Sequence, residues 1–155
     1  MNDDYQMQYE GNVFSVIRQL YYKEGRKLSL DLGIFINGLP IFTVELKNPF
    51  TGQTVENAIY QYRNDRNPKE PLFKFGRCLG HFAVDPDLVY VTTHLKGKST
   101  FFLPFNKGKY GGAGNVSVHD NFASHYLWEE IWTKDSLLNI LNQFIHMIDV
   151  EDDKG

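Results

Sequence analysis

The residues best suited to chemistry in this sequence are Asp31, Glu45 and Lys47, which lie in two β-rich segments, residues 28–36 and 41–47. Successive side chains of a β-strand point to opposite faces, so Glu45 and Lys47 would share one face of their strand. Side chains two residues apart on a strand are separated by about 6.5–7 Å. A carboxylate and an ammonium group are therefore expected side by side on one face of a sheet.

The turn between the two segments brings Asp31 to the same place. Asn37-Gly38 is a strong signal for a short β-hairpin, and the Leu-Pro pair after it is expected to lengthen the turn. A register that pairs Asp31 with Glu45 and Ile36 with Pro40 is self-consistent and leaves residues 37–39 in the loop. In this register Asp31 lies directly across from Glu45.

This predicted pair of facing carboxylates suits a metal ion, because two carboxylates repel unless a cation lies between them. Mg²⁺ prefers hard oxygen ligands, takes few carboxylates and keeps several waters. Lys47 would position or polarise a bound water or hold a phosphate oxygen, so a phosphate-bearing substrate is expected. The alternative is an ordinary salt bridge between Glu45 and Lys47 on the solvent side of the hairpin, which is the more frequent case for such spacing.

Composition and cysteine content limit the class of protein. The chain has 155 residues, of which 42% are hydrophobic and 23% charged, as in a single globular domain. One cysteine excludes an internal disulfide and a four-cysteine zinc site. No apolar run approaches the length of a membrane span and no secretory signal opens the chain, so we expect a soluble cytoplasmic protein without membrane contact.

The charges are unevenly distributed along the chain. The net charge is −3, but residues 18–109 hold 14 Lys and Arg against 8 Asp and Glu. A basic middle region can contact phosphates even when the whole chain is acidic. The alternative is chance together with a solvated acidic tail, residues 150–155, and the charges by themselves favour this alternative.

The elements expected around the hairpin indicate an α/β (α+β) fold with a mixed β-sheet core flanked by helices. Apolar residues at helical spacing predict a helix, or a helix that turns into a strand, over residues 9–22. Thr54 is the predicted N-cap of a helix that ends near Asn64. The inner face of that helix is predicted to carry Val55, Ala58, Ile59 and Tyr62. A second hairpin is predicted over residues 88–95 and 99–105, and two helices over residues 124–132 and 134–149, the second capped by Thr133.

The segment from Asp31 to Pro49 resembles the nuclease core of the R (restriction and motor) subunit of type I restriction–modification enzymes, a family of the PD-(D/E)xK nuclease superfamily. The shared pattern is an aspartate on one strand, then Asn-Gly-Leu-Pro, then Glu-x-Lys-Asn-Pro. The likeness continues at residues 78–84, 102–106, 112–115 and 126–130. It implies a restriction-endonuclease-like fold for a single domain, residues 1–149, which would be a fragment of a much longer chain.

The resemblance also implies a role for each core residue. Asp31, Glu45 and the carbonyl of Leu46 would bind Mg²⁺, and Lys47 would generate or orient the attacking water. The implied reaction is hydrolysis of phosphodiesters in double-stranded DNA.

Two further positions follow from the resemblance, and one departs from it. Members of the family often carry a Gln-x-x-x-Tyr element on the helix after the core. Gln61 matches the glutamine of this element, which implies that it is a catalytic residue. Asp65 stands where the tyrosine would be. Tyr62 or Arg63 would then take over part of that role. Some nucleases of this class draw a further acid from the first helix, and Glu10 is the candidate.

In the family, this domain precedes an ATP-driven translocase and works with methyltransferase and specificity subunits. ATP and S-adenosylmethionine are therefore expected only in the full-length complex, and Mg²⁺ is the cofactor expected here. Two alternatives stay open from the sequence. The domain would be a non-catalytic module that docks DNA or the motor, or it would be another nuclease of the same fold, such as a repair or resolvase-like enzyme.

Overall fold

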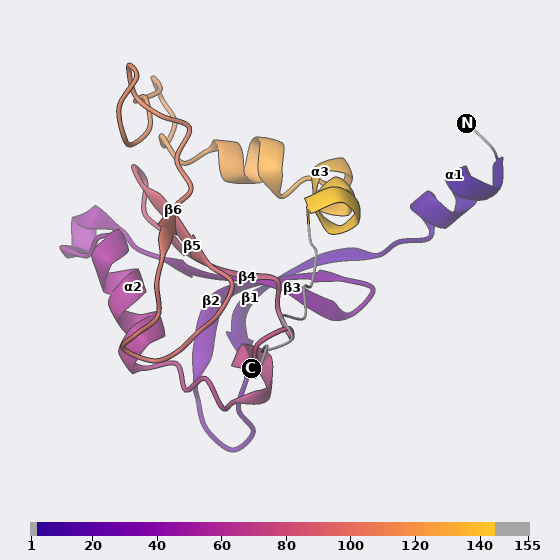
Figure 1. Ribbon diagram of the computed structural model, residues 1–155, viewed down its shortest axis with the longest axis horizontal. Coiled ribbons are helices and arrows are strands. Elements are labelled where there is room, and N and C mark those ends of the chain that lie inside the picture. The colour runs from indigo at the N-terminus through magenta and orange to yellow at the C-terminus, as the bar shows by residue number, and fades with distance from the viewer. Residues whose placement is uncertain (1–2, 145–155) are drawn as a thin grey trace, which may run out of the picture. The chain divides into compact units, whose positions relative to one another are not determined.

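The computed structural model describes residues 3–144, and its residues before 126 are built on a six-stranded mixed β-sheet (Figure 1). The strands follow one another across the sheet in chain order, β1 to β6. Only β3 and β4 pair in parallel, and the other neighbours are antiparallel. The strands are β1 Phe14–Tyr21, β2 Ser29–Ile36, β3 Leu39–Leu46, β4 Gly80–Val84, β5 Val89–Thr92 and β6 Leu103–Pro104. The predicted α+β class with a mixed sheet is confirmed.

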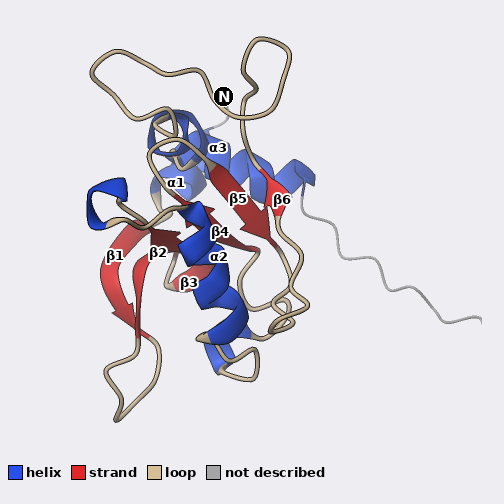
Figure 2. Cartoon of the chain, turned by 90° about the vertical axis from the view of Figure 1, so that its left-hand side faces the viewer, coloured by secondary structure: helices blue, strands red, loops and turns tan. Residues whose placement is uncertain are grey.

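The helix α2, Val55–Asn64, lies in the connection between β3 and β4 and crosses one face of the sheet (Figure 2). Parallel neighbours need such a crossover connection, and here it also holds short 3₁₀ turns at Pro49–Thr51 and Pro71–Phe73. Asp85 Oδ2 accepts a hydrogen bond of 2.8 Å from the first backbone N–H of the helix, that of Val55. The four predicted inward residues are all buried, so both the bounds and the face of this helix are as predicted.

The core between α2 and the sheet is apolar apart from a few polar groups. Its buried members are Leu30, Val55, Ala58, Ile59, Tyr62, Phe73, Ala83, Leu95 and Phe102. Burial of this apolar surface is the main force that holds the helix on the sheet.

The β2–β3 hairpin corrects one prediction. Its inner part keeps the predicted register, but a bulge between Ile34 and Phe35 shifts the outer part. Ile36 therefore pairs with Leu39 and not with Pro40, and only Asn37-Gly38 form the turn. Both turn residues have positive φ, 51° and 77°, as a two-residue hairpin turn of type I′ requires. The bulge, rather than a longer loop, absorbs the extra residue.

Of the two alternatives predicted for residues 9–22, the structure shows the helix that turns into a strand, and the strand takes up most of this range. A helix, α1, covers Asp3–Glu10, and β1 begins at Phe14. Asn37 fixes the start of β1, because its Oδ1 accepts from the Val13 N–H at 2.8 Å. Most β1 side chains are exposed, so no alternation of buried and polar residues marks the strand in the sequence.

The second predicted hairpin is present but shorter than expected. Its ladder joins Tyr90 to Pro104 and Val91 to Leu103, so β6 has two residues. Residues 93–102 between the strands form turns instead of continuing the ladder.

The chain divides into two compact units at residues 125 and 126. The described part of the second unit holds a π-helical turn at Leu127–Ile131, α3 at Lys134–Asn139 and another π-helical turn at Ile140–Phe144. Thr133 caps α3, as predicted, by accepting from the Ser136 N–H. The rest of the predicted helix to residue 149 and the acidic tail, residues 150–155, lie outside the described residues, and the single domain over residues 1–149 stays a prediction.

Within residues 3–144, no helix combines the length and the apolar composition that a membrane span needs.

Candidate active site

Asp31 and Glu45 lie opposite each other at the end of the β2–β3 ladder. The last ladder pair before them is Leu32 with Val44, so the next residues on each strand face one another. Asp31 Oδ2 accepts a hydrogen bond of 2.7 Å from the Leu46 N–H, which ties this carboxylate to β3. The Asp31 charge also contributes to raising the pKa of Glu45. The structure therefore brings the two predicted carboxylates together.

Glu45 is a buried carboxyl group, with 1% of its surface exposed. Burial raises its pKa to about 7, because loss of water disfavours the charged form, and the neighbouring Arg66 opposes this rise. Arg66 Nε donates to Glu45 Oε1 at 2.7 Å, and Arg66 Nη2 donates to the same oxygen at 2.5 Å. The expectation of a plain surface salt bridge to Lys47 is thus not met, since the ion-pair partner of Glu45 is a buried arginine.

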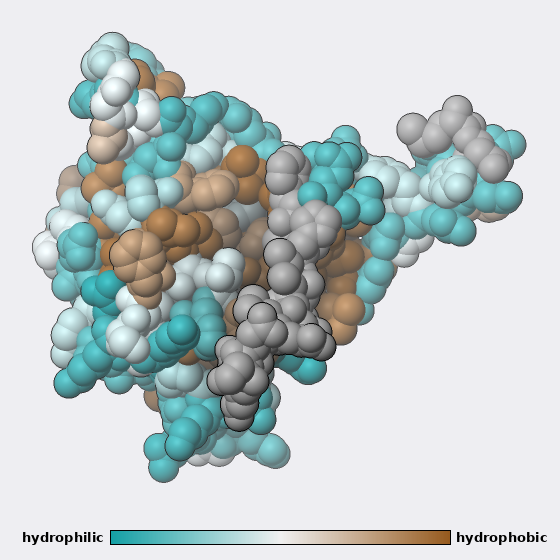
Figure 3. Space-filling view, viewed as in Figure 1, coloured by the Kyte–Doolittle hydropathy of each residue, from teal (hydrophilic) through white to brown (hydrophobic). Residues whose placement is uncertain are grey.

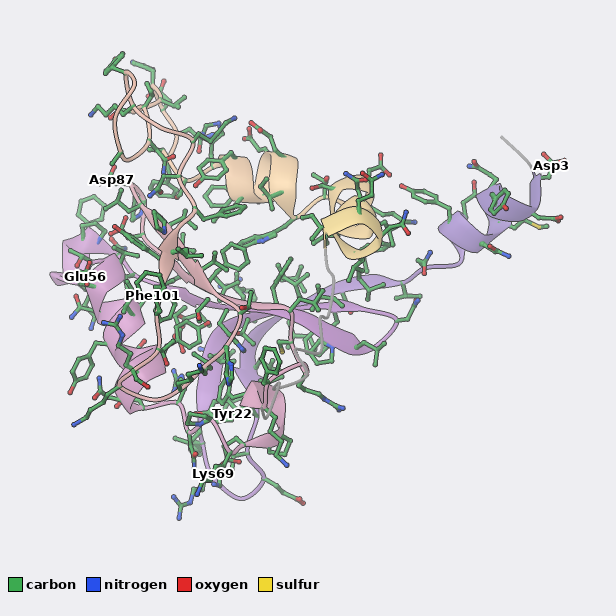
Figure 4. The ribbon with its side chains drawn as sticks, viewed as in Figure 1. Asp3, Tyr22, Glu56, Lys69, Asp87 and Phe101 are labelled. Carbon is green, nitrogen blue, oxygen red and sulfur yellow. The ribbon has the colours of Figure 1, made fainter. Side chains whose placement is uncertain are left out.

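Arg66 is the residue at this site that the sequence analysis missed. It follows α2, is 9% exposed, and also donates from Nη1 to the Tyr22 hydroxyl at 3.2 Å. Its guanidinium carbon lies 5.7 Å from the centre of the Tyr22 ring, which Figure 4 labels. Burial disfavours the Arg66 charge, but the charge and hydrogen bonds of Glu45, together with those of Tyr22, outweigh burial and raise the pKa of Arg66. The sequence offered one indication of this role for Arg66. Arg66 directly follows Asp65, the position at which the sequence departs from the family pattern.

Lys47 follows the last residue of β3 and is half-buried. Its backbone N–H donates to the Val84 carbonyl at 2.8 Å, which fixes the residue beside β4. Its positive charge lowers the pKa of Glu45 and so acts on that carboxylate. In the part of the chain that the structure describes, the Lys47 ammonium group forms no ion pair.

A chain of buried polar groups lies beneath Glu45. Thr43 Oγ1 is 2.9 Å from the Tyr62 hydroxyl and 2.6 Å from His81 Nδ1. Burial lowers the pKa of His81 to about 4, so its ring is neutral at neutral pH. Burial, and then the negative charge of Glu45, raise the pKa of Tyr62. Tyr62 therefore keeps its proton, and Glu45 lies close enough to act on it.

Gln61 lies on α2, and its side-chain oxygen is buried without a hydrogen-bond partner among the described residues. Its backbone carbonyl accepts from the N–H groups of Asp65 and Arg66, at 2.8 and 3.1 Å, where the helix ends. Arg63 turns away from Glu45 toward the turn before β6, because its Nε donates to the Thr100 carbonyl at 3.0 Å. Of the two substitutes considered for the missing tyrosine, Tyr62 is therefore the one near the site.

Glu10 lies at the other end of the hairpin. It is exposed in α1, where it accepts a hydrogen bond of 2.7 Å from Gln6. The strand that follows begins at Phe14, which pairs with Ile36. Ile36 is about 17 Å along β2 from Asp31 at the usual strand rise. The structure thus does not bring Glu10 to the carboxylate pair.

The donor groups at the site fit Mg²⁺ better than a softer metal. The described residues hold no group of three or more His, Cys, Asp and Glu placed to bind a metal ion. Mg²⁺ needs only one or two protein carboxylates because it keeps several of its waters. Within residues 3–144, Glu45 Oε2 and Asp31 Oδ1 take no hydrogen bond, so each carboxylate retains an oxygen for a cation.

A polar, mainly basic turn lies at the same end of the sheet. Residues 22–28 join β1 to β2, and Figure 3 shows hydrophilic side chains gathered there, at the lower end of the view. Lys23 in this turn forms an ion pair with Glu70, whereas Arg26 and Lys27 are exposed. The turn leads directly into β2 and so toward Asp31.

Comparison with known proteins gives one family and two relatives. A family model described as the type I restriction enzyme R protein N terminus matches residues 4–100. One relative is a Methanocaldococcus jannaschii protein named as the putative type I restriction enzyme MjaVIIIP endonuclease subunit. It is 27% identical over 146 residues, which cover 88% of this chain and 12% of the relative's length. Another from the same organism, named for the MjaIXP endonuclease subunit, is 34% identical over 68 residues, or 44% of this chain and 6% of its own. No solved structure matches the chain.

Proposed function

The chain belongs to the family of type I restriction enzyme R protein N termini, and from this premise we propose that it is a Mg²⁺-dependent endonuclease domain acting on double-stranded DNA. The observation that carries the proposal is the pairing of Asp31 with the buried Glu45, next to a lysine without an ion-pair partner among the described residues. Two carboxylates and an adjacent cation are the groups that hydrolysis of a phosphodiester needs at close range.

The proposed chemistry divides the work among four residues. Asp31, Glu45 and the Leu46 carbonyl would hold Mg²⁺, and the bound ion would supply Lewis-acid chemistry at the phosphate and at a bound water. Lys47 orients the attacking water or neutralises a phosphate oxygen. The water oxygen forms a new bond to phosphorus, the bond to one bridging oxygen breaks, and that oxygen leaves with a proton.

Gln61 has a supporting part in this proposal. Its buried side-chain oxygen has no hydrogen-bond partner among the described residues, and such a group costs stability unless it meets a water or a ligand. We assign it the positioning of a water at the site.

The proposed DNA contacts are to the phosphate backbone. Arg26 and Lys27 are exposed on the turn that leads into β2, and Lys69 is exposed on the segment after Arg66 (Figure 4). Such contacts hold DNA without reading its sequence. Recognition of a DNA sequence would then belong to a specificity subunit.

The remaining parts of the proposal concern the full-length protein. The chain spans 12% and 6% of the two relatives it matches, so most of each relative lies outside the matched region. We propose that an ATP-driven translocase follows this domain, and that the complex includes methyltransferase and specificity subunits. ATP and S-adenosylmethionine would act only in that complex.

Cleavage by the complete assembly tests the assignment. Lys47→Ala and Asp31→Ala should each abolish DNA cleavage, because one removes the cation beside the phosphate and the other removes a metal ligand. DNA binding and ATP hydrolysis should persist in both. Lys109→Ala, at an exposed lysine in the loop of residues 106–115, is the matched control and should cut DNA normally.

Two outcomes would contradict the proposal. Cleavage that survives both Lys47→Ala and Asp31→Ala would show that the site lies elsewhere. An unaltered assembly that binds and translocates DNA but never cuts it would favour a docking module over a nuclease.

A further inference from the structure

Glu45 has a built-in positive partner. Two nitrogens of Arg66 donate to Glu45 Oε1, at 2.7 and 2.5 Å, and both side chains are buried. A buried carboxylate is costly unless a positive charge and hydrogen bonds compensate it, and a guanidinium group supplies both. The charge of Glu45 is thus balanced within the protein before any divalent cation binds.

Arg66 has a second partner that does not involve Glu45. Its Nη1 donates to the Tyr22 hydroxyl at 3.2 Å, and its guanidinium lies 5.7 Å from the centre of that ring. Tyr22 is itself held by an edge-on contact with Phe73, at 4.8 Å between ring centres. These contacts would keep Arg66 near the site if it released Glu45.

A divalent cation between Asp31 and Glu45 would meet the Arg66 charge at short range. Like charges repel strongly where burial excludes water. Arg66 also donates two hydrogen bonds to one oxygen of Glu45, which reduces the electron density that this oxygen offers a cation. The cation and the guanidinium therefore compete for one carboxylate.

We propose that Arg66 is a positioning residue that holds Glu45 through Oε1 when no metal is bound and releases this oxygen, turning toward Tyr22, when a divalent cation binds the same carboxylate at its other oxygen. This inference rests on the proposed function, since it needs the cation site. In this proposal, the cation displaces Arg66, which is the counter-ion of Glu45 in the metal-free protein. Arg66 therefore lowers the affinity for the metal, and at the same time it keeps the Glu45 side chain oriented.

Solvent exchange of arginine side-chain protons tests the displacement directly. In NMR spectra of the whole chain, Mg²⁺ should speed exchange of the Arg66 Nε proton on the order of tenfold, because its hydrogen bond to Glu45 is lost. Arg63 is the matched control, since its Nε donates to the Thr100 carbonyl and its exchange should not change. An unchanged Arg66 exchange rate with Mg²⁺ bound would overturn the inference.

Calorimetric titration with Mg²⁺ at pH 8.5 gives a second test. Arg66→Gln should bind Mg²⁺ roughly tenfold more tightly than the unaltered chain, because a competing charge is removed. Asp31→Asn should lose binding. Equal or weaker binding by a folded Arg66→Gln would reject the role of Arg66 and leave the cation site intact. If the unaltered chain binds no Mg²⁺, or Asp31→Asn binds it equally well, the cation site of the proposed function fails instead.

Discussion

At the scale of single residues, burial decides the chemistry of the site. Glu45 and His81 are almost fully buried. Burial raises the pKa of Glu45 and lowers the pKa of His81, so in each case it favours the neutral form. Arg66 offsets this cost for Glu45, whereas the hydrogen-bond partner of His81 within residues 3–144 is the uncharged hydroxyl of Thr43. The two groups thus differ in what a change of pH does to them.

His81 should make the fold sensitive to mild acid. Its pKa is about 4 in the folded chain, against an ordinary value near 6.5 when unfolded. The unfolded chain therefore binds a proton at higher pH, so the stability that the neutral ring gives is complete above pH 6.5. This contribution to the free energy of unfolding, about 3 kcal/mol in all, is lost as the pH falls from about 6.5 to 4.

Guanidinium unfolding of His81→Gln across this pH range checks the prediction. The variant should lose that part of the pH dependence between pH 7 and pH 4.5. His119→Gln is the matched control, because His119 is exposed and should leave the slope unaltered. A slope for His81→Gln equal to that of the unaltered chain would show that His81 does not titrate as burial requires.

At the scale of elements, the hairpin turn and its bulge set the position of Asp31. The turn has two residues, both with positive φ, and the bulge next to it restores the register toward the site. A slip of one residue would send Asp31 to the opposite face from Glu45. The turn is therefore part of how the two carboxylates meet.

Gly38→Ala should destabilise the fold by roughly 1–2 kcal/mol, the cost of a left-handed conformation with a Cβ atom. An added Cβ at Gly38 would meet nothing within 4 Å, so the cost is one of backbone conformation and not of crowding. Thermal unfolding measures the effect. Gly112→Ala, at a glycine whose φ is not positive, is the control and should be nearly neutral. Equal stability of the two variants would contradict the turn assignment.

At the scale of the whole molecule, part of the basic charge of the middle region lies at the end of the sheet that carries the β1–β2 turn. Arg26 and Lys27 on the β1–β2 turn, and Lys69 after α2, are exposed near the strand that carries Asp31. Under the proposed function, these residues would contact DNA phosphates, although the net charge of the chain is −3. Phosphate contacts at this end would bring a DNA strand to the carboxylate pair.

The double substitution Arg26→Glu and Lys27→Glu should weaken binding of duplex DNA of any sequence. Each lost phosphate contact should also reduce the slope of log affinity against log salt by about 1. Fluorescence anisotropy at several salt concentrations measures both effects. Lys109→Glu reverses one charge on a different loop and should have little effect. A loss of affinity with an unchanged salt slope would argue against direct phosphate contacts.

The sequence by itself determined the local elements whose residues carry strong signals. The bounds and inner face of α2 follow from Thr54 and the apolar spacing after it, and the hairpin follows from Asn37-Gly38. The placement of Asp31 opposite Glu45 also followed, because hairpin register is a local property.

Only the tertiary structure decided the burial of Glu45 and its pairing with Arg66. These residues are 21 positions apart, and the crossover through α2 brings them together. The bounds of the edge strand β1 were likewise set by the tertiary structure, because its side chains are mostly exposed and only pairing with β2 defines it. Local patterns encode turns, caps and faces, whereas burial and ion pairing depend on which elements pack together, and spacing along the chain does not specify that.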